Sequence, residues 1–292
     1  MKSDGTPNKN WQNDMGNGGG GPNGMGRPDD NGNGTGGKPP AMPTSDDTGL
    51  TIETAANRTT DSTDTTDNTS TSAKALKAGN EVNISGGEFK IDSADDSVHS
   101  NGNIVITGGN ISVASGDNGM HADGNLTISD GTVDITKSYE GIEGSIVTID
   151  GGTISVVASD DGINCAGGSD TGSTDRMGAD QFSSQDGVEL NINGGTVTID
   201  ADGDGLDSNG NFTMAGGTVY VCGPTNGGNG ALDYNGTATV TGGTLIACGA
   251  VGMEEGFGDS STQYSVLHDL GSTVSALSLI HISEPTRLAL IS

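Results

Sequence analysis

Acidic residues recur at a regular place along the middle of the chain. Each group stands two to four residues before a single apolar residue, with glycine and serine around it. Two carboxylates held about 5 Å apart repel each other by roughly 1 kcal/mol in bulk water and by several-fold more at a protein surface. A row of such groups requires raised pKa values or bound cations. The acids of this row are Asp95, Asp96, Asp117, Glu140, Asp160, Asp161, Asp202 and Asp204.

The ligand chemistry of the acidic row favours Ca²⁺. Carboxylate oxygens in a flexible loop, with backbone carbonyl groups nearby, suit Ca²⁺ better than Zn²⁺. The alternative is a solvated acidic edge with diffuse counterions. We expect at least one bound Ca²⁺, with all the acids named above as its candidate ligands.

A second polar position follows directly after each of the apolar residues. His99 and His121 occupy it in neighbouring repeats, as in a two-histidine metal site, but no third nitrogen or sulfur ligand follows. Glu143 alone would have to complete such a site, so we favour a surface ladder of polar side chains over a transition-metal site. The candidate ligand-binding residues at this position are His99, His121, Glu143, Asn164 and Asp207.

A repeat of about 22 residues gives these side chains their common position. The segment NIVITGGNISVASGDNGMHADG, residues 103–124, returns as NLTISDGTVDITKSYEGIEG and as SIVTIDGGTISVVASDDGINCA, and twice more after an interruption. Within each unit the apolar residues alternate on both sides of a glycine turn, which predicts strand, turn and strand. A further apolar position holds Leu76, Val98, Met120, Ile142, Ile163, Leu206, Leu232 and Met253.

Three short strands in each repeat predict an all-β fold, a right-handed single-stranded parallel β-helix of about 7–8 coils. One coil cannot bury its apolar face alone, so coils stack about 4.8 Å apart with equivalent residues above one another. This stacking gathers the acids on one edge. The corner glycines are expected to need positive φ; they are Gly87, Gly109, Gly131, Gly152, Gly195, Gly217 and Gly243.

Composition divides the chain into segments. We expect a disordered Gly/Asn/Pro-rich arm over 1–49, because it cannot bury enough apolar surface to offset its ordering entropy. The β-helix is predicted over 50–276, with a Ser/Thr/Asp loop over 59–72, an inserted loop at a corner over 167–187 and a further strand over 264–267. The remainder, 277–292, obeys none of the coil rules. Its LSLIHISEPTR resembles a translated adapter from transposase-based sequencing libraries, and we exclude it from fold reasoning.

The charge of the chain excludes several classes of protein. The 292 residues carry a formal net charge of −28 with 3% aromatic residues. Such an acid excess repels phosphate backbones and anionic lipid, which argues against a nucleic-acid partner. No apolar run of about 20 residues exists, so we expect no membrane span. We expect a monomer.

The cysteines do not make a disulfide framework, because there are three of them. Cys222 and Cys248 fall in the same position of adjacent coils, where a bridge is possible but strained, since parallel strands aim both side chains the same way. We favour free thiols there. Cys165 is expected to be a small buried filler.

Lys137 lies beside the acidic row and is the candidate for a catalytic base. In β-helix lyases that act on uronic acids, a basic residue removes the C5 proton while Ca²⁺ neutralises the carboxylate. Such a lysine needs a lowered pKa, whereas neighbouring acids raise it. We therefore favour a charge-balancing lysine. The chain has no glycine-rich phosphate loop before a helix and no Ser-His-Asp set that its spacing supports.

Several motifs together, SADDSVHSNGNIVITGG, SYEGIEG, ASDDGIN, DGDGLDSNGN and GPTNGGNGALDYNGTATVTGGT, resemble a bacterial family labelled carbohydrate-binding domain-containing. Its best-described relatives are clostridial cellulose- and acidic-sugar-binding β-helix proteins. The resemblance spans about residues 73–257. It implies an extracellular or cell-surface location, Ca²⁺ held by corner aspartates and a fold similar to pectate-lyase β-helices. By position, the matching aspartates are Asp95, Asp96, Asp117, Asp160, Asp161, Asp202 and Asp204, while Asn118 and Tyr139 depart from the family's paired acids.

We therefore expect calcium-assisted binding of a cell-wall or acidic, uronate-type polysaccharide. An acidic protein repels an acidic polysaccharide unless Ca²⁺ bridges the two. The alternatives are a calcium-dependent pectate-type lyase that uses Lys137, and a structural adhesin or spacer. The fold alone does not decide between binding and catalysis. The low aromatic content argues against a flat stacking platform for crystalline cellulose.

Overall fold

The computed structural model describes residues 50–53, 73–166 and 184–271, which belong to one compact unit. The expectations for the arm over 1–49, the loop over 59–72, most of the insertion and the tail over 277–292 concern residues outside this described part.

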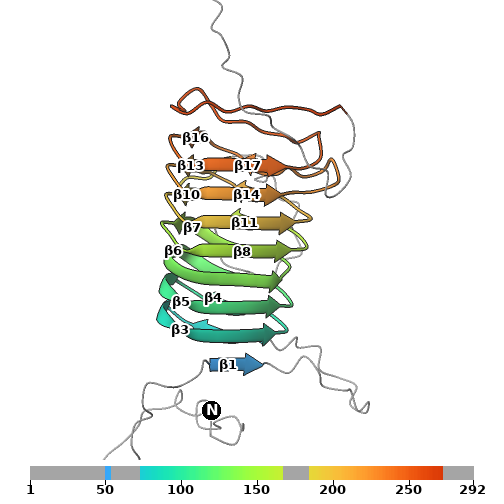
Figure 1. Ribbon diagram of the computed structural model, residues 1–292. Coiled ribbons are helices and arrows are strands. Elements are labelled where there is room, and N and C mark those ends of the chain that lie inside the picture. The colour runs from blue at the N-terminus through green and yellow to red at the C-terminus, as the bar shows by residue number, and fades with distance from the viewer. Residues whose placement is uncertain (1–49, 54–72, 167–183, 272–292) are drawn as a thin grey trace, which may run out of the picture. The chain divides into compact units, whose positions relative to one another are not determined.

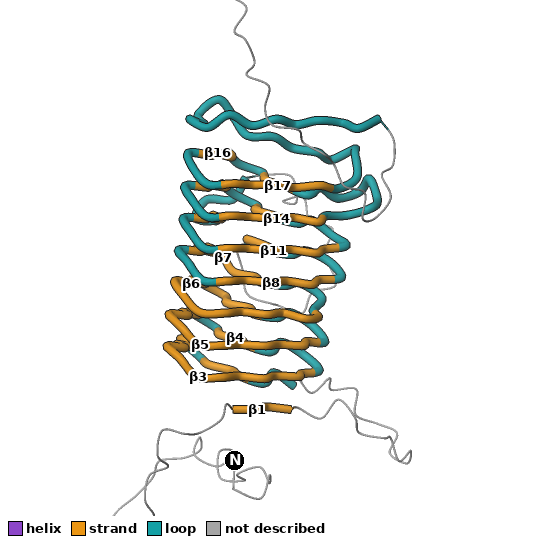
Figure 2. The backbone as a smooth tube through the Cα atoms, viewed as in Figure 1, coloured by secondary structure: helices purple, strands orange, loops and turns teal. Residues whose placement is uncertain are grey.

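All regular elements of the described chain are β-strands, and they form one parallel sheet that is wound into a solenoid (Figures 1 and 2). Successive coils are about 22 residues apart and make about 7 turns. In Figure 1 the near-side strands β8, β11, β14 and β17 point to the right while the chain climbs, which is the sense of a right-handed coil. The predicted right-handed parallel β-helix is confirmed.

The strands fall into three stacked ladders, and the longer ones bend to contribute to more than one ladder. They are β1 (Leu50–Glu53), β2 (Leu76–Ala78), β3 (Glu81–Ser93), β4 (Val98–Ser100), β5 (Asn103–Ser115), β6 (Met120–Lys137), β7 (Ile142–Ile149), β8 (Thr153–Ala158), β9 (Ile163–Cys165), β10 (Glu189–Ile192), β11 (Thr196–Ala201), β12 (Leu206–Ser208), β13 (Asn211–Met214), β14 (Thr218–Cys222), β15 (Leu232–Tyr234), β16 (Ala238–Val240) and β17 (Thr244–Cys248).

The ladder of short strands sets the vertical register on which the predicted site depends. Val98 of β4 pairs with Leu76 of β2 below it and with Met120 of β6 above it. The same register continues through β7, β9, β12 and β15. Each residue that follows these apolar positions therefore lies above its equivalent in the coil below, as predicted.

The interior is filled by the inward-pointing residues of each strand. Ile104, Ile106 and Ile111 are all 0% exposed. Full burial of such a side chain contributes about 1.5–3 kcal/mol. The turn between them needs Gly109, whose φ of 108° lies in a region that residues with a Cβ rarely adopt. The other predicted corner glycines also have positive φ; they are Gly87, Gly131, Gly152, Gly195, Gly217 and Gly243.

Three further expectations can be checked in the described part. The strand predicted over 264–267 is wrong: these residues form no regular element, and Tyr264 is fully exposed. Cys165 is buried as expected. Cys222 and Cys248 are exposed, lie opposite each other in the register of β14 and β17, and have free thiols. No helix in the described ranges is long and apolar enough to cross a membrane.

Candidate functional site

The corners that precede the short strands stack as regularly as the strands do. The backbone N–H of Ser97 donates to the carbonyl of Asn118 at 3.1 Å, and that of Gly119 donates to Glu140 at 2.9 Å. Equivalent bonds continue upward to Asp161 and Asp204. Side chains two residues before each short-strand apolar residue thus form one column, which consists of Lys74, Asp96, Asn118, Glu140, Asp161 and Asp204.

We call this column, together with the polar side chains beside it, the seam. The N-terminal half of the seam comprises Lys74, Asp95, Asp96, His99, Asp117, His121 and Glu143. The C-terminal half of the seam comprises Asp160, Asp161, Asn164, Asp204, Asp207 and Asp233.

Several carboxylates of the column fasten their coil to the next one. Asp96 Oδ1 accepts a hydrogen bond from the backbone N–H of Asn118 at 3.2 Å, and Asp161 Oδ1 accepts one from Asp204 at 2.7 Å. Asp204 Oδ1 accepts one from Gly230. One oxygen of each aspartate therefore satisfies a backbone donor at a tight corner, while the other remains for contacts within the seam.

Glycine is required where these corners approach one another. A Cβ on Gly141 would lie only 2.3 Å from the carbonyl oxygen of Gly162 in the next coil and 2.2 Å from Cγ1 of Val156. The backbone would have to move apart to admit it. This close stacking keeps Glu140 and Asp161 directly above one another, on neighbouring rungs of the seam, where a rung is the part of the seam that one coil contributes.

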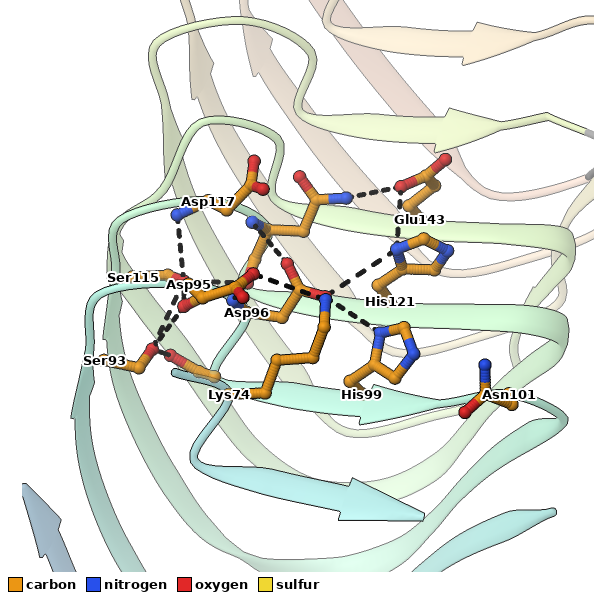
Figure 3. Close-up of polar contacts among 12 residues, drawn as sticks. Lys74, Ser93, Asp95, Asp96, His99, Asn101, Ser115, Asp117, His121 and Glu143 are labelled. Atoms are coloured by element: carbon orange, nitrogen blue, oxygen red, sulfur yellow. Dashed lines mark hydrogen bonds and ion pairs between the residues drawn. The ribbon is translucent and has the colours of Figure 1, made fainter. Parts of the chain in front are cut away.

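In the N-terminal half of the seam, the fully buried Asp96 is the centre of the contacts (Figure 3). Its Oδ2 contacts the Lys74 ammonium and lies 2.8 Å from His99 Nδ1. Lys74 also lies 3.3 Å from Asp95 Oδ1. These acids are therefore balanced by a cation from the chain itself.

Two pKa shifts reflect this arrangement. Burial lowers the pKa of Lys74, but hydrogen bonding and attraction to Asp96 and Asp95 outweigh it, so the pKa is raised overall and Lys74 stays charged. The pKa of His99 is lowered, first by burial and then by repulsion from Lys74, against the opposing effect of Asp96. His99 is accordingly neutral at pH 7.

The C-terminal half of the seam has the opposite electrostatics. Carboxylate oxygens of Asp161, Asp204 and Asp207 all lie within 4.8 Å of one another. Within the described residues no Lys, Arg or His side chain forms an ion pair with any of them. The three carboxylates therefore repel one another without a counter-charge from the described chain.

The pKa values of these acids are raised. Burial raises the pKa of Asp161 to about 8, with repulsion from Asp160, Asp204 and Glu140 as the next causes. Burial, followed by repulsion from Asp161 and other acids, raises the pKa of Asp207 to about 9. The pKa of Asp204 is raised to about 6, because burial outweighs the hydrogen bond that its carboxylate accepts from Gly230. This half of the seam holds protons at neutral pH unless a cation replaces them.

A buried neutral oxygen belongs to the strand directly below that of Asp207. Asn164 stands one rung below Asp207 in the register of β9 and β12. Its Oδ1 is buried and has no hydrogen-bond partner within the described part of the chain. An unsatisfied buried carbonyl next to carboxylates matches the all-oxygen ligand set that Ca²⁺ prefers. The residues present therefore fit a calcium ion.

The structure sorts the acids predicted from the sequence into two groups. Asp95, Asp96 and Asp117 lie close together in the N-terminal half, and Asp161 and Asp204 lie together in the C-terminal half. Asp160 is half-buried next to Asp161, and Glu140 is buried between the two groups. Asp202 is exposed and belongs to neither group. Lys137 is exposed at the end of β6.

The predicted surface ladder is wrong for the two histidines. His99 is 3% exposed and His121 is 1% exposed. Both side chains turn toward Asp96 rather than toward solvent, with His121 Nδ1 at 3.9 Å from Asp96 Oδ2 and 3.4 Å from Glu143 Oε2. Their rings meet edge to face with centroids 5.0 Å apart. Polar partners in the seam thus make their burial possible.

Two contributors were missed in the sequence. Lys74 precedes Leu76 by two residues, just as Asp96 precedes Val98 in the next coil. Extending the column by one coil toward the N-terminus would therefore have found Lys74. Asp123 lies 3.5 Å from His121 Nε2. Nothing in the repeat pattern distinguishes Asp123 from other polar corner residues.

A parallel β-solenoid with a polar seam along its axis belongs to the class of repeat proteins that offer an extended binding surface. The family model described as carbohydrate-binding domain-containing protein matches residues 41–119 and 120–230, so the chain belongs to this family of carbohydrate-binding proteins. Neither a curated protein nor a solved structure matches it. Family membership supports a carbohydrate as its partner.

Proposed function

We propose that this protein binds an acidic, uronate-type polysaccharide through Ca²⁺ held in the C-terminal half of the seam. The cluster of Asp161, Asp204 and Asp207 is the observation that carries the proposal. Its raised pKa values mean that a positive charge is favoured at this place, since protons already bind there more tightly than to ordinary carboxylates.

Each residue of the cluster has a distinct part in holding the ion. Asp161 and Asp204 each use one oxygen to bind the backbone of the next coil, which fixes the direction of the other oxygen. Asp207 accepts no such bond from the described residues and supplies its carboxylate from β12. Asn164 adds a neutral oxygen, which keeps the site from accumulating further negative charge.

The calcium ion supplies the attraction that the chain lacks. With a net charge of −28, the protein repels a polyuronate by itself. A dication that keeps coordination positions open toward solvent accepts a sugar carboxylate as a further ligand. Binding of the metal and of the polysaccharide is therefore coupled, and each raises the affinity for the other.

The same proposal places the protein outside the cell or on its surface, as a monomer. Polysaccharides of this class are extracellular ligands, and extracellular calcium modules work with dissociation constants of roughly 10⁻⁴–10⁻³ M. A cluster that must first lose its protons matches such moderate affinity.

The test is retention of the full chain on immobilised polygalacturonate, followed by calorimetric Ca²⁺ titration with and without oligogalacturonide. We expect retention in Ca²⁺, elution by EDTA, and tighter Ca²⁺ binding when the oligosaccharide is present. Asp207→Asn should lose retention, whereas the matched control Asp202→Asn, an exposed acid of the same corner, should keep it. Retention that EDTA leaves unchanged would contradict the proposal, and so would equal behaviour of the two variants.

A further inference from the structure

The N-terminal half of the seam contains ligand atoms of a different chemistry from those proposed for calcium. Asp96, His99 and His121 each offer one atom, and these atoms all lie within 4.8 Å of one another. The three side chains are 0%, 3% and 1% exposed. Two imidazole nitrogens and a carboxylate oxygen thus converge in a place shielded from water (Figure 3).

His121 is oriented as metal-bound histidines commonly are. Its Nδ1 faces the centre, 3.9 Å from Asp96 Oδ2 and 3.4 Å from Glu143 Oε2. Its other nitrogen, Nε2, lies 3.5 Å from Asp123 Oδ1, and Asn101 holds the second oxygen of Asp123 with a 3.2 Å hydrogen bond. A carboxylate behind the distal nitrogen fixes the ring and its tautomer in many metal sites.

We propose that Asp96, His99 and His121, with Glu143 as a fourth ligand, bind one transition-metal dication such as Zn²⁺. Two nitrogen and two oxygen ligands suit Zn²⁺, Co²⁺ or Ni²⁺, whereas Ca²⁺ and Mg²⁺ select oxygen. The site shares no ligand with the calcium cluster and differs from it in ligand type, although Glu143 lies one coil below Asn164. It requires neither carbohydrate nor Ca²⁺.

Lys74 is the internal competitor of this metal. Its ammonium contacts Asp96 Oδ2, the oxygen that faces both histidines. Lys74 also reaches Asp95 Oδ1 at 3.3 Å, so it keeps a partner when a metal takes Asp96. A metal ion must displace the ammonium or remain beside it, and both cost affinity. Removal of Lys74 should therefore tighten metal binding, which a merely structural lysine would not do.

The experiment uses the full chain without a histidine tag, stripped with EDTA and dialysed. Zn²⁺ is titrated by calorimetry in saturating Ca²⁺, and Co²⁺ is followed by its visible absorption, which reports nitrogen ligation. We expect one Zn²⁺ per chain that Ca²⁺ does not displace. His99→Ala and His121→Ala should each weaken Zn²⁺ binding by about 100-fold or more, and Asp123→Asn by about tenfold. Lys74→Met should tighten it by about tenfold.

Asp207→Asn, in the other half of the seam, is the matched control and should leave Zn²⁺ affinity unchanged. Equal affinity in the parent protein and in His121→Ala would overturn the proposal, as would a Co²⁺ spectrum that this substitution does not change. A Lys74→Met variant with unchanged or weaker binding would overturn it too. Circular dichroism verifies the β-fold of each variant, and His121→Gln replaces His121→Ala where the latter does not fold.

Discussion

The two halves of the seam share a backbone and differ in charge. In both halves a column aspartate accepts a hydrogen bond from the coil above, at Asp96 and at Asp161. The N-terminal half adds Lys74 to its acids, and the C-terminal half adds further acids, Asp207 and Asp233. The repeat therefore fixes where a side chain lies, and the residue at each rung decides whether that rung is neutralised internally or requires a cation from outside.

This difference reverses the effect of removing an acid. In the N-terminal half, an acid lost from around Lys74 leaves a desolvated ammonium behind. In the C-terminal half, an acid lost from the cluster relieves repulsion. The predictions below test this contrast, from the largest expected effect to the smallest.

Asp96→Ala should destabilise the protein by about 3 kcal/mol, because the buried Lys74 ammonium keeps only Asp95 at 3.3 Å and the Asn118 backbone N–H loses its acceptor. Chemical denaturation measures the change. Lys77→Ala, one coil below His99 and exposed, is the control and should stay within about 0.5 kcal/mol of the parent. Similar stability of Asp96→Ala and the parent protein would show that the N-terminal half is not held by its ion pairs.

The C-terminal half of the seam should make the protein less stable as the pH rises, which is the opposite of what salt-bridged aspartates do. The pKa of Asp161 is about 8 and that of Asp207 about 9 when folded, against about 3.9 for an unfolded aspartate. The folded state therefore binds more protons between these values, and the stability contribution of these groups falls as pH rises through that window. In EDTA, Tm should be several degrees lower at pH 8 than at pH 5. Ca²⁺ should restore it at pH 8 and have little effect at pH 5.

Asp161→Asn combined with Asp207→Asn is the control for that measurement. This double variant should show a smaller decrease in Tm between pH 5 and pH 8, and Ca²⁺ should no longer raise its Tm at pH 8. A decrease of the same size in this double variant would assign the pH dependence to other acids.

Asp207→Asn alone should stabilise the metal-free protein by at least about 1 kcal/mol at pH 8, because asparagine replaces a group that has to take up a proton when the protein folds at that pH. Denaturation in EDTA gives the value, with the exposed Asp202→Asn as control. Destabilisation by Asp207→Asn would mean that the cluster is satisfied without a metal, and the contrast between the halves would fail.

Lys137→Ala should have the smallest effect. The side chain is exposed and makes no ion pair within the described residues. We expect unchanged retention on polygalacturonate, stability within about 0.5 kcal/mol, and no unsaturated uronate product from either protein. Ultraviolet absorbance of that product is the measurement. Its formation by the parent and loss in Lys137→Ala would make the protein a lyase.

The fold was predictable because every rung repeats the same local signals. Alternating apolar residues gave the strands, and the corner glycines, such as Gly109 with its positive φ, gave the turns. The stacking of Leu76, Val98 and Met120 followed from the repeat alone. The end of the described chain was less predictable: 264–267 has β-forming residues but no strand, since local propensity does not ensure a neighbouring rung to pair with.

The site was predictable in position and less so in chemistry. The sequence placed the acids on one edge of the coils, which holds for all of them except the exposed Asp202, but it did not give the direction in which each side chain turns. His99 and His121 were expected on the surface and are buried, because Asp96 hydrogen-bonds His99 and the carboxylates of Asp96 and Glu143 lie close to His121. The neutralising role of Lys74 also depends on a side-chain contact between coils, which residue spacing does not specify.

The hydrogen bond that each column aspartate accepts from the backbone of the next coil has a consequence for how such a protein can diverge. The acceptor oxygen that joins the coils is also present in asparagine, so a single exchange removes the charge of a rung and leaves its scaffold intact. Asn118 stands at this position between Asp96 and Glu140. The number and placement of charged rungs can thus change gradually in a lineage, and ligand preference can drift along an unchanged spiral.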